Sequence, residues 1–414
     1  MGVNDLSFNQ LSTVLNAING HATGTVSPAA VTTADFISVA QATLKTGYDP
    51  VIQAISQVLG KTIFSIRPYS RKFKGLRVDN QRFGYITRKI QIADKPFEND
   101  DRIPLTDGQS VDMYKINKPN ALQTNIYGQN VFQKSLTLFR DQLDSAFKGP
   151  DEFGEFVSMV MTNASDMIEQ AHESLARAAL VNFMAGKMVY DVGNVKHVLK
   201  DYNDALGLTS TARLTKADIL APENFKSFVQ WFYSYVASIS SMMTERSAKF
   251  HMNVTQFGGT VDPDTGAITG GTDKTVMRHT PYNKQKVYIL NEWRYAADAR
   301  ALADTYHDTY LKYADVETPN FWQFINLPDA ISATPMCINA AGLNIAPTSG
   351  IAVSNIIGCI FDEEALGYTV MNEWSSATPL NARGGYTNMF WHFTDRYWND
   401  FTENGVILVL DDPA

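Results

Sequence analysis

Three consecutive carboxylic acids form the densest group of side chains that could do acid-base chemistry. Asp362, Glu363 and Glu364 directly follow the apolar run from Ile356 to Phe361. Paired carboxylates are the groups that glycosidases use as general acid and as base or nucleophile. Acidic residues at the end of a strand also commonly cap the turn that follows it. The position after a predicted strand favours this turn role over catalysis.

Histidine and cysteine, the usual ligands of zinc, are present without the spacing of a metal site. None of the seven histidines stands in an HxxxH or HxH pair. The two cysteines, Cys337 and Cys359, form no CxxC motif, so they support neither a zinc site nor a disulfide framework. We expect two buried free thiols in a reducing compartment, with one bridge between them as the alternative. We expect no metal and no cofactor. The alternative is a metal site whose ligands are distant in the sequence and are brought together only by folding.

The glycine-rich segment 257–271 has the composition of a phosphate-binding loop. A P-loop requires Lys followed by Ser or Thr after its last glycine, but Thr272 and Asp273 follow Gly271. The Asp-Pro-Asp sequence at 262–264 favours a turn, so the segment is predicted to be a small exposed hairpin with glycine hinges. The chain also lacks the Gly-x-Ser-x-Gly motif and the Cys/His signatures of hydrolases. The sequence therefore predicts no enzymatic activity.

Aromatic side chains gather near the C-terminus, where they could stack on sugars or bases. The strand predicted from Met389 to Phe401 has aromatic residues on both faces, so we expect a covered strand whose aromatic side chains are core. Glycan binding is the alternative. The cluster consists of Phe390, Trp391, Phe393, Tyr397, Trp398 and Phe401.

The strongest charge pattern lies within residues 61–135. Residues 61–93 contain nine lysines and arginines but only one acid, Asp79. In residues 94–112 most of the charged residues are acidic. Extended runs on both sides of this reversal predict a long two-stranded excursion, which is at best marginally stable alone. It must therefore lie on its own domain or on a neighbouring chain. Nucleic-acid binding by the basic strand is the alternative, but the acidic half would repel phosphate.

Composition sets the class of molecule. The chain has 414 residues, of which 44% are hydrophobic and 11% aromatic, and its formal net charge is −8. The aromatic content excludes a disordered chain, and the acidic balance argues against a protein that coats nucleic acid. The N-terminus lacks the features of a signal peptide, and no apolar run reaches the length of a membrane span. We expect a folded, soluble, mildly acidic protein.

Apolar periodicity predicts the elements that must position these residues. From Pro150, apolar residues recur at three- and four-residue steps, which predicts a helix of about 35 residues ending near Gly186. Its polar residues, Asp166, Glu169, Glu173 and Arg177, are expected on a solvated face. Shorter helices are predicted from Asp35, from Asp49 to Gly60, from Glu223 to Lys249, and from Trp293 to Tyr313. Residues 1–32 show only weak helical spacing, which is typical of an arm without its own core.

Extended runs indicate where the sheet lies. Strands are predicted at Lys286–Leu290, Ile356–Phe361, Met389–Phe401 and Val406–Leu410. We expect an antiparallel sheet that completes the core. Together with the helices, this predicts an α+β protein.

The order of parts resembles the Hong Kong 97 fold of tailed-phage major capsid proteins. Two stretches carry a closer resemblance to the major head protein of small podoviruses. Residues 137–147 with 152–157 are similar to the start of its long helix. Residues 379–392, Pro-Leu-Asn-Ala-Arg-Gly-Gly-Tyr-Thr-Asn-Met-Phe-Trp-His, resemble the stretch before its last sheet strand.

The resemblance implies a domain plan and an assembly. It implies an N-terminal arm at 1–60, an extended loop at 61–135, a peripheral domain with a spine helix at 136–220, an axial domain at 221–345, and terminal strands at 346–414 that return to the peripheral and axial core. It implies hexamers and pentamers that build an icosahedral head around double-stranded DNA, without sequence-specific binding. Scaffolding, portal and decoration proteins are the further partners that it implies. The protein would be made in the host cytoplasm and would reside in the virion.

Charge complementarity between neighbours sets register and choice of partner more than affinity. We therefore expect the extended loop to pair with adjacent subunits. The candidate inter-subunit residues are Arg67, Arg71, Lys72, Lys74, Arg77, Glu98, Asp100 and Asp101. Two alternatives stay open: an encapsulin-type nanocompartment shell, and a phage tail or receptor-binding protein that binds glycans.

Overall fold

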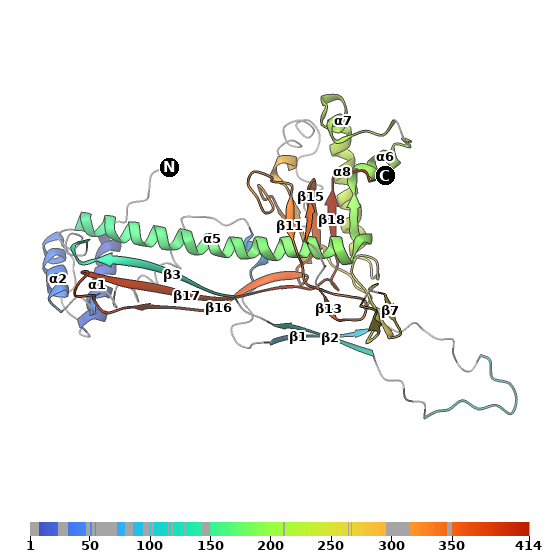
Figure 1. Ribbon diagram of the computed structural model, residues 1–414, viewed down its shortest axis with the longest axis horizontal. Helices are drawn as coiled ribbons and strands as arrows, with labels where there is room; N and C mark the ends of the chain where they lie inside the picture. The colour runs from blue at the N-terminus through green and yellow to red at the C-terminus, as the bar shows by residue number, and fades with distance from the viewer. Residues whose placement is uncertain are drawn as a thin grey trace.

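The computed structural model shows a mixed helix and sheet protein, in agreement with the α+β prediction (Figure 1). It describes residues 8–23, 32–46, 50–51, 54, 73–78, 86–93, 100, 103–114, 116, 120–127, 130–142, 150–209, 212–263, 265, 267–294, 315–345 and 350–413. The helix predicted from Trp293 lies almost entirely outside these residues, as does most of the helix predicted from Asp49. No helix in the described part is long and apolar enough to cross a membrane.

One long helix, α5 (Pro150–Tyr190), runs along the molecule (Figure 1). It begins where the sequence predicts, but it does not end at Gly186 and continues to Tyr190. Gly186 is instead a packing residue, because the ring of Phe401 occupies the space that a Cβ there would need. A Cβ at this position would lie 2.2 Å from Phe401 Cε1. The predicted solvated face is partly wrong: Glu169 and Glu173 are buried. Glu173 accepts a hydrogen bond from Arg177 Nε at 3.0 Å, which satisfies the buried carboxylate.

A three-stranded sheet lies along α5 and covers one of its sides (Figure 1). It has the order β16-β17-β3 and is antiparallel throughout. The strands are β3 (Asn130–Phe139), β16 (Leu366–Ala377) and β17 (Tyr386–Asn399). Strand β3 passes through residue 135, where the sequence places the end of the extended loop.

Burial alternates along β17, which tests the prediction for the aromatic cluster. Trp391 and Phe393 are buried, as is Phe401 beyond the strand end. Phe390 and Trp398 are only half-buried. The prediction of a strand covered on both faces is therefore wrong, since one face of the sheet packs on α5 and the other is more open.

A second sheet has five strands (Figure 1). Together with the helices between Val198 and Met243, which share its core, it makes up the region called the compact part below. The sheet has the order β10-β9-β15-β18-β4, and its two outer pairings are parallel. The predicted antiparallel pairing is confirmed for Ile356–Phe361 with Val406–Leu410, but the strand predicted from Met389 to Phe401 lies in the other sheet, as β17. The strands of the five-stranded sheet are β4 (Val195–His197), β9 (Gln285–Ile289), β10 (Asp315–Glu317), β15 (Ile356–Asp362) and β18 (Gly405–Val409). Every residue of β15 and β18 is buried, as continuous apolar runs require.

Helix α8 (Pro222–Met243) belongs to this compact part and begins with Pro at its first position. Its predicted apolar face is buried throughout, from Phe225 to Met243. It ends six residues before the predicted Lys249. Short elements complete this region: η2 (Val192–Asn194), α6 (Val198–Ala205), α7 (Lys216–Leu220), η4 (Tyr282–Lys284), β11 (Ile331–Ala333), β12 (Cys337–Ile338), β13 (Asn344–Ile345) and β14 (Ile351–Val353).

The glycine-rich segment forms the predicted exposed hairpin. It comprises β5 (Val254–Phe257), β6 (Thr260–Val261), β7 (Ile268–Thr269) and β8 (Thr272–Lys274), in two antiparallel pairs. Gly258, Gly270 and Gly271 have φ values of 76°, 74° and 93°, a region that favours glycine.

Two helices of the N-terminal segment pack together near the start of α5 (Figure 1). They are α1 (Phe8–Thr23) and α2 (Thr33–Lys45), and Thr32 with Asp35 forms a capping box at the start of α2. Leu15, Ile18 and Phe36 are buried. The helices predicted here are confirmed, but the segment has more buried apolar surface than its weak spacing suggests.

Candidate functional site

A two-stranded hairpin extends away from the compact part (Figure 1). It pairs β1 (Ile86–Ala93) with β2 (Asn120–Tyr127) in a continuous antiparallel register from Ile86–Tyr127 to Ala93–Asn120. This confirms the predicted two-stranded excursion. Because a two-stranded hairpin is marginal alone, its contacts with the rest of the chain determine its position.

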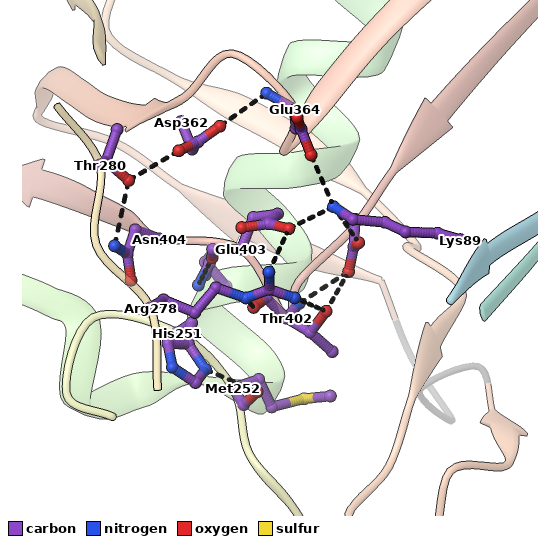
Figure 2. A network of polar contacts seen from close by, with 12 residues as sticks. Lys89, His251, Met252, Arg278, Thr280, Asp362, Glu364, Thr402, Glu403 and Asn404 are labelled. Carbon is purple, nitrogen blue, oxygen red and sulfur yellow. Dashed lines mark hydrogen bonds and ion pairs between the residues drawn. The ribbon is translucent and has the colours of Figure 1, made fainter. Parts of the chain in front are cut away.

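One contact is ionic and centres on Lys89, which lies on β1 with its side chain 21% exposed (Figure 2). Its Nζ lies 3.1 Å from Asp400 Oδ2 and 3.3 Å from Glu364 Oε2. It also contacts the Glu403 carboxylate. Asp400 and Glu403 belong to the turn between β17 and β18, and Glu364 belongs to the turn after β15. One cation of the hairpin therefore joins two turns that are distant in sequence.

A second cation supports these carboxylates from the opposite side (Figure 2). Arg278 Nη1 lies 2.8 Å from Glu403 Oε1. Its Nε donates a hydrogen bond to the Thr402 carbonyl at 2.8 Å. The Thr402 hydroxyl and amide in turn donate to Asp400 Oδ1, at 2.6 and 2.9 Å. The turn is therefore held in one conformation by charge-assisted hydrogen bonds.

Burial and charge act against each other in this network. Burial raises the pKa of Glu403 to about 7, even though Lys89 and Arg278 both favour its ionised form. Burial also opposes ionisation of Asp400, but Lys89 and the hydrogen bonds from Thr402 hold its pKa below the usual value. Burial would lower the pKa of Lys89, but Asp400 and Glu403 outweigh it and the pKa is raised. Lys89 therefore stays charged.

The other contact of the hairpin is apolar. Leu122 of β2 is buried in a small cluster with Val254 and Val276, against which Ile338 packs. Next to it, a groove of about 620 Å³ separates β2 from the compact part and is lined by residues such as Trp398 and Leu343. Among the described residues, the hairpin is thus held by an ionic contact at Lys89 and an apolar contact at Leu122, with the groove next to the latter.

The far end of the hairpin presents apolar side chains to solvent. Ile103, Met113, Tyr114 and Ile116 are 78 to 81% exposed. Monomeric soluble proteins rarely expose such a concentration of large apolar side chains, which marks interaction sites.

The structure describes only some of the candidate residues from the charge pattern. Arg67, Arg71, Lys72, Glu98 and Asp101 lie outside the described residues, and only the backbone of Lys74 is described. Asp100 is exposed.

Arg77 is half-buried within its own chain. It forms a β-bridge with Tyr368 and lies close enough to Asp395 to favour the ionised form of that carboxyl. Burial is the stronger effect and raises the pKa of Asp395 to about 6. This placement ties Arg77 to the edge of β16.

The three consecutive acids, Asp362 to Glu364, lie at the end of β15 and in the turn that follows it, as predicted. Asp362 is buried, accepts a hydrogen bond from the Thr280 hydroxyl at 2.7 Å, and accepts one from the Glu364 amide at 2.9 Å (Figure 2). Cys337 and Cys359 are buried free thiols, as predicted. Among the described residues, no group of three or more His, Cys, Asp or Glu side chains could hold a metal ion.

Sequence reasoning missed the network around Lys89. Lys89 was only one member of a basic stretch, Asp400 fell within the strand predicted from Met389 to Phe401, and Glu403 was not singled out. No local signal distinguishes them, because the partners of Lys89 lie more than 270 positions away in the sequence. The one available signal was the marginal stability of the hairpin, which required an anchor.

Comparison with known proteins identifies the fold. The chain is similar to a chain of the capsid structure of Staphylococcus phage Andhra, with 13% identity and a TM-score of 0.51 over 84% of this chain and 86% of that one. It is also similar to a chain in the structure of head fiber and inner core protein gp22 of native bacteriophage P68. That match has 13% identity, a TM-score of 0.53 and the same coverage. At this identity, the likenesses show the fold alone.

The family is shown by the sequence. No curated protein matches the chain. A family model of the Phi29-like phage major capsid protein, however, matches residues 15–409, which is nearly the whole chain. The protein therefore belongs to the Phi29-like phage major capsid protein family and has a structural role in the phage capsid.

Proposed function

We propose that the chain assembles as hexamers and pentamers into an icosahedral head that encloses double-stranded DNA. The observation that carries this proposal is the exposed apolar end of the hairpin, at Ile103, Met113, Tyr114 and Ile116. Exposed apolar surface of this kind marks a site of interaction with another chain. In a shell of identical subunits, that chain is a second copy.

The proposal assigns parts of a Hong Kong 97-like plan to the fold. The arm is residues 1–60, the extended loop 61–135, the peripheral domain 136–220 and the axial domain 221–345, with terminal strands at 346–414. In this plan α5 is the spine helix, and the hairpin β1-β2 lies over a neighbouring subunit. Basic and acidic residues of the loop pair with complementary charges on the neighbour and set its register.

The remaining partners follow from the same role. Scaffolding, portal and decoration proteins contact the shell, and DNA is enclosed without sequence-specific contacts. The subunit catalyses no reaction, is made in the host cytoplasm and is incorporated into the virion. An overall charge of −8 suits a container that does not grip its DNA.

The proposal is tested by making the end of the hairpin polar. The variant combines Ile103→Ser, Met113→Ser and Ile116→Ser, and the control is Val192→Ser, at a residue 61% exposed outside the hairpin. We expect the triple variant to keep the wild-type thermal midpoint but to form no shells by electron microscopy, whereas the control assembles. Normal shells from the triple variant would contradict the role of the hairpin.

The same micrographs and fractions separate the alternatives. Shells that contain cargo protein and package no DNA would identify a nanocompartment. A tail or receptor-binding protein would show saturable glycan binding that Trp398→Ala removes without unfolding the chain. Trp391 is buried, so Trp391→Ala would test the core instead.

A further inference from the structure

A pocket separate from the groove beside β2 has a basic lining, in contrast to the acidic balance of the whole chain. It encloses about 470 Å³ and lies between β4, the start of α6, α8 and residues 249–250. Its lining includes Lys196, His197, Lys200 and Lys249. Four basic residues thus surround one concave surface of a protein whose net charge is −8.

The carboxylates around this pocket are already engaged. Asp201 accepts a hydrogen bond from the Tyr235 hydroxyl. Asp411 pairs with His197, with 2.5 Å between Oδ1 and Nδ1. The hydrogen bond from Tyr235 does not remove the charge of Asp201, which still favours the charged form of Lys196, so three lysines outnumber the one carboxylate that lines the pocket.

The charges around Lys196 act in both directions. Burial lowers the pKa of Lys196 most and the charge of Lys249 lowers it further, whereas Asp201 and Asp191 raise it, and the net pKa is lowered. Lys196 Nζ donates a hydrogen bond to the Gly193 carbonyl at 2.9 Å, which orients the ammonium group without neutralising it. A bound anion would remove this repulsion.

We propose that this pocket binds a phosphate group, with Lys196, Lys200 and Lys249 as its cationic ligands. Lysine offers a compact point charge, which suits a tetrahedral polyanion that takes donors from several directions. Arginine forks hold planar carboxylates and phosphates alike, and no arginine lines the pocket, so an anion bound there is held by the point charges of lysines. Free phosphate and a phosphate of a DNA backbone share this chemistry.

The first test is titration of the full-length chain with inorganic phosphate by calorimetry at constant ionic strength. We expect saturable binding of one phosphate per chain. Lys196→Gln with Lys249→Gln should weaken the affinity by about a hundredfold, because each lost charge-assisted hydrogen bond is worth about tenfold. The control is Lys226→Gln, an exposed lysine of α8 outside the pocket, which makes the same change of charge.

A second titration distinguishes the sources of phosphate. If a short DNA duplex binds and inorganic phosphate displaces it, the ligand is a backbone phosphate; if only inorganic phosphate binds, the ligand is the free ion. Absence of saturable binding, equal binding by the double variant, or binding of an acidic peptide alone would overturn the proposal. If the double variant fails to fold, Lys249→Gln alone gives the same test, since Lys249 is exposed.

Discussion

At the scale of single residues, the position of the hairpin depends on one half-buried cation, Lys89. Lys89 meets two carboxylates that are nearly inaccessible, Asp400 at 2% and Glu403 at 5% side-chain exposure. Removing one partner of such a group leaves uncompensated buried charge, which is more destabilising than the net value of the pair. The network therefore acts as an anchor that is sensitive to loss of any member.

The first prediction concerns Lys89→Met, which keeps the length of the side chain and removes the charge. We expect the free energy of unfolding to fall by about 2 kcal/mol, less than for a fully buried pair because Lys89 is partly exposed. We also expect faster amide exchange in β1. The matched control, Arg88→Met, changes an exposed residue of the same strand and should stay within about 0.5 kcal/mol. Equal effects in urea unfolding would show that the anchor is unimportant.

The second prediction concerns the pH dependence that Glu403 confers. Its pKa of about 7 in the folded chain lies above its ordinary value of 4.5, so the folded state binds more protons between these values. Stability should therefore fall as pH rises from about 4.5 to 7, by at most about 3 kcal/mol from this group. Glu403→Gln should flatten that slope, and Glu245→Gln, at an exposed position, should not. A slope unchanged in Glu403→Gln would contradict the assignment.

At the scale of elements, close packing decides where helices end. Periodicity predicted the start of α5 and the buried face of α8, since both follow from spacing along one helix. The end of α5 could not be predicted, because Gly186 is a packing residue beneath Phe401 and not a helix stop. Burial of Glu173 was equally hidden, since its partner Arg177 is itself covered by the Phe321 ring at 3.8 Å.

The third prediction tests that packing. Gly186→Ala should destabilise the chain by about 2 kcal/mol, although alanine favours a helix by about 1 kcal/mol, because a Cβ would overlap the Phe401 ring. Gly193→Ala is the control, since no atom lies within 4 Å of a Cβ built there. A Gly186→Ala chain as stable as wild type in urea would show that the ring can move aside freely.

At the scale of the whole molecule, assembly depends on surfaces that no single chain covers. The charge reversal and the extended runs on both sides of it predicted the two-stranded excursion. The sequence could not predict the apolar contact of Leu122 or the partners of Lys89, because these contacts join segments that only the complete fold brings together. The candidate inter-subunit charges remain predictions.

The fourth prediction belongs to this scale. Reversing the charge at Arg71, Lys72 and Lys74 together should weaken contacts between subunits and make assembly more sensitive to salt, since exposed charge pairs are screened. Shell yield across a salt series, measured by light scattering, gives the comparison. Shells that match the wild type at every salt concentration would remove the electrostatic account of the loop.

Light scattering of the purified chain across a concentration series, with electron microscopy of the heaviest fraction, tests the central claim most directly. We expect rings of five and six subunits or closed shells, formed by the chain alone or with a scaffolding protein. A monomer of 46.0 kDa at every concentration, with the scaffolding protein present, would contradict it.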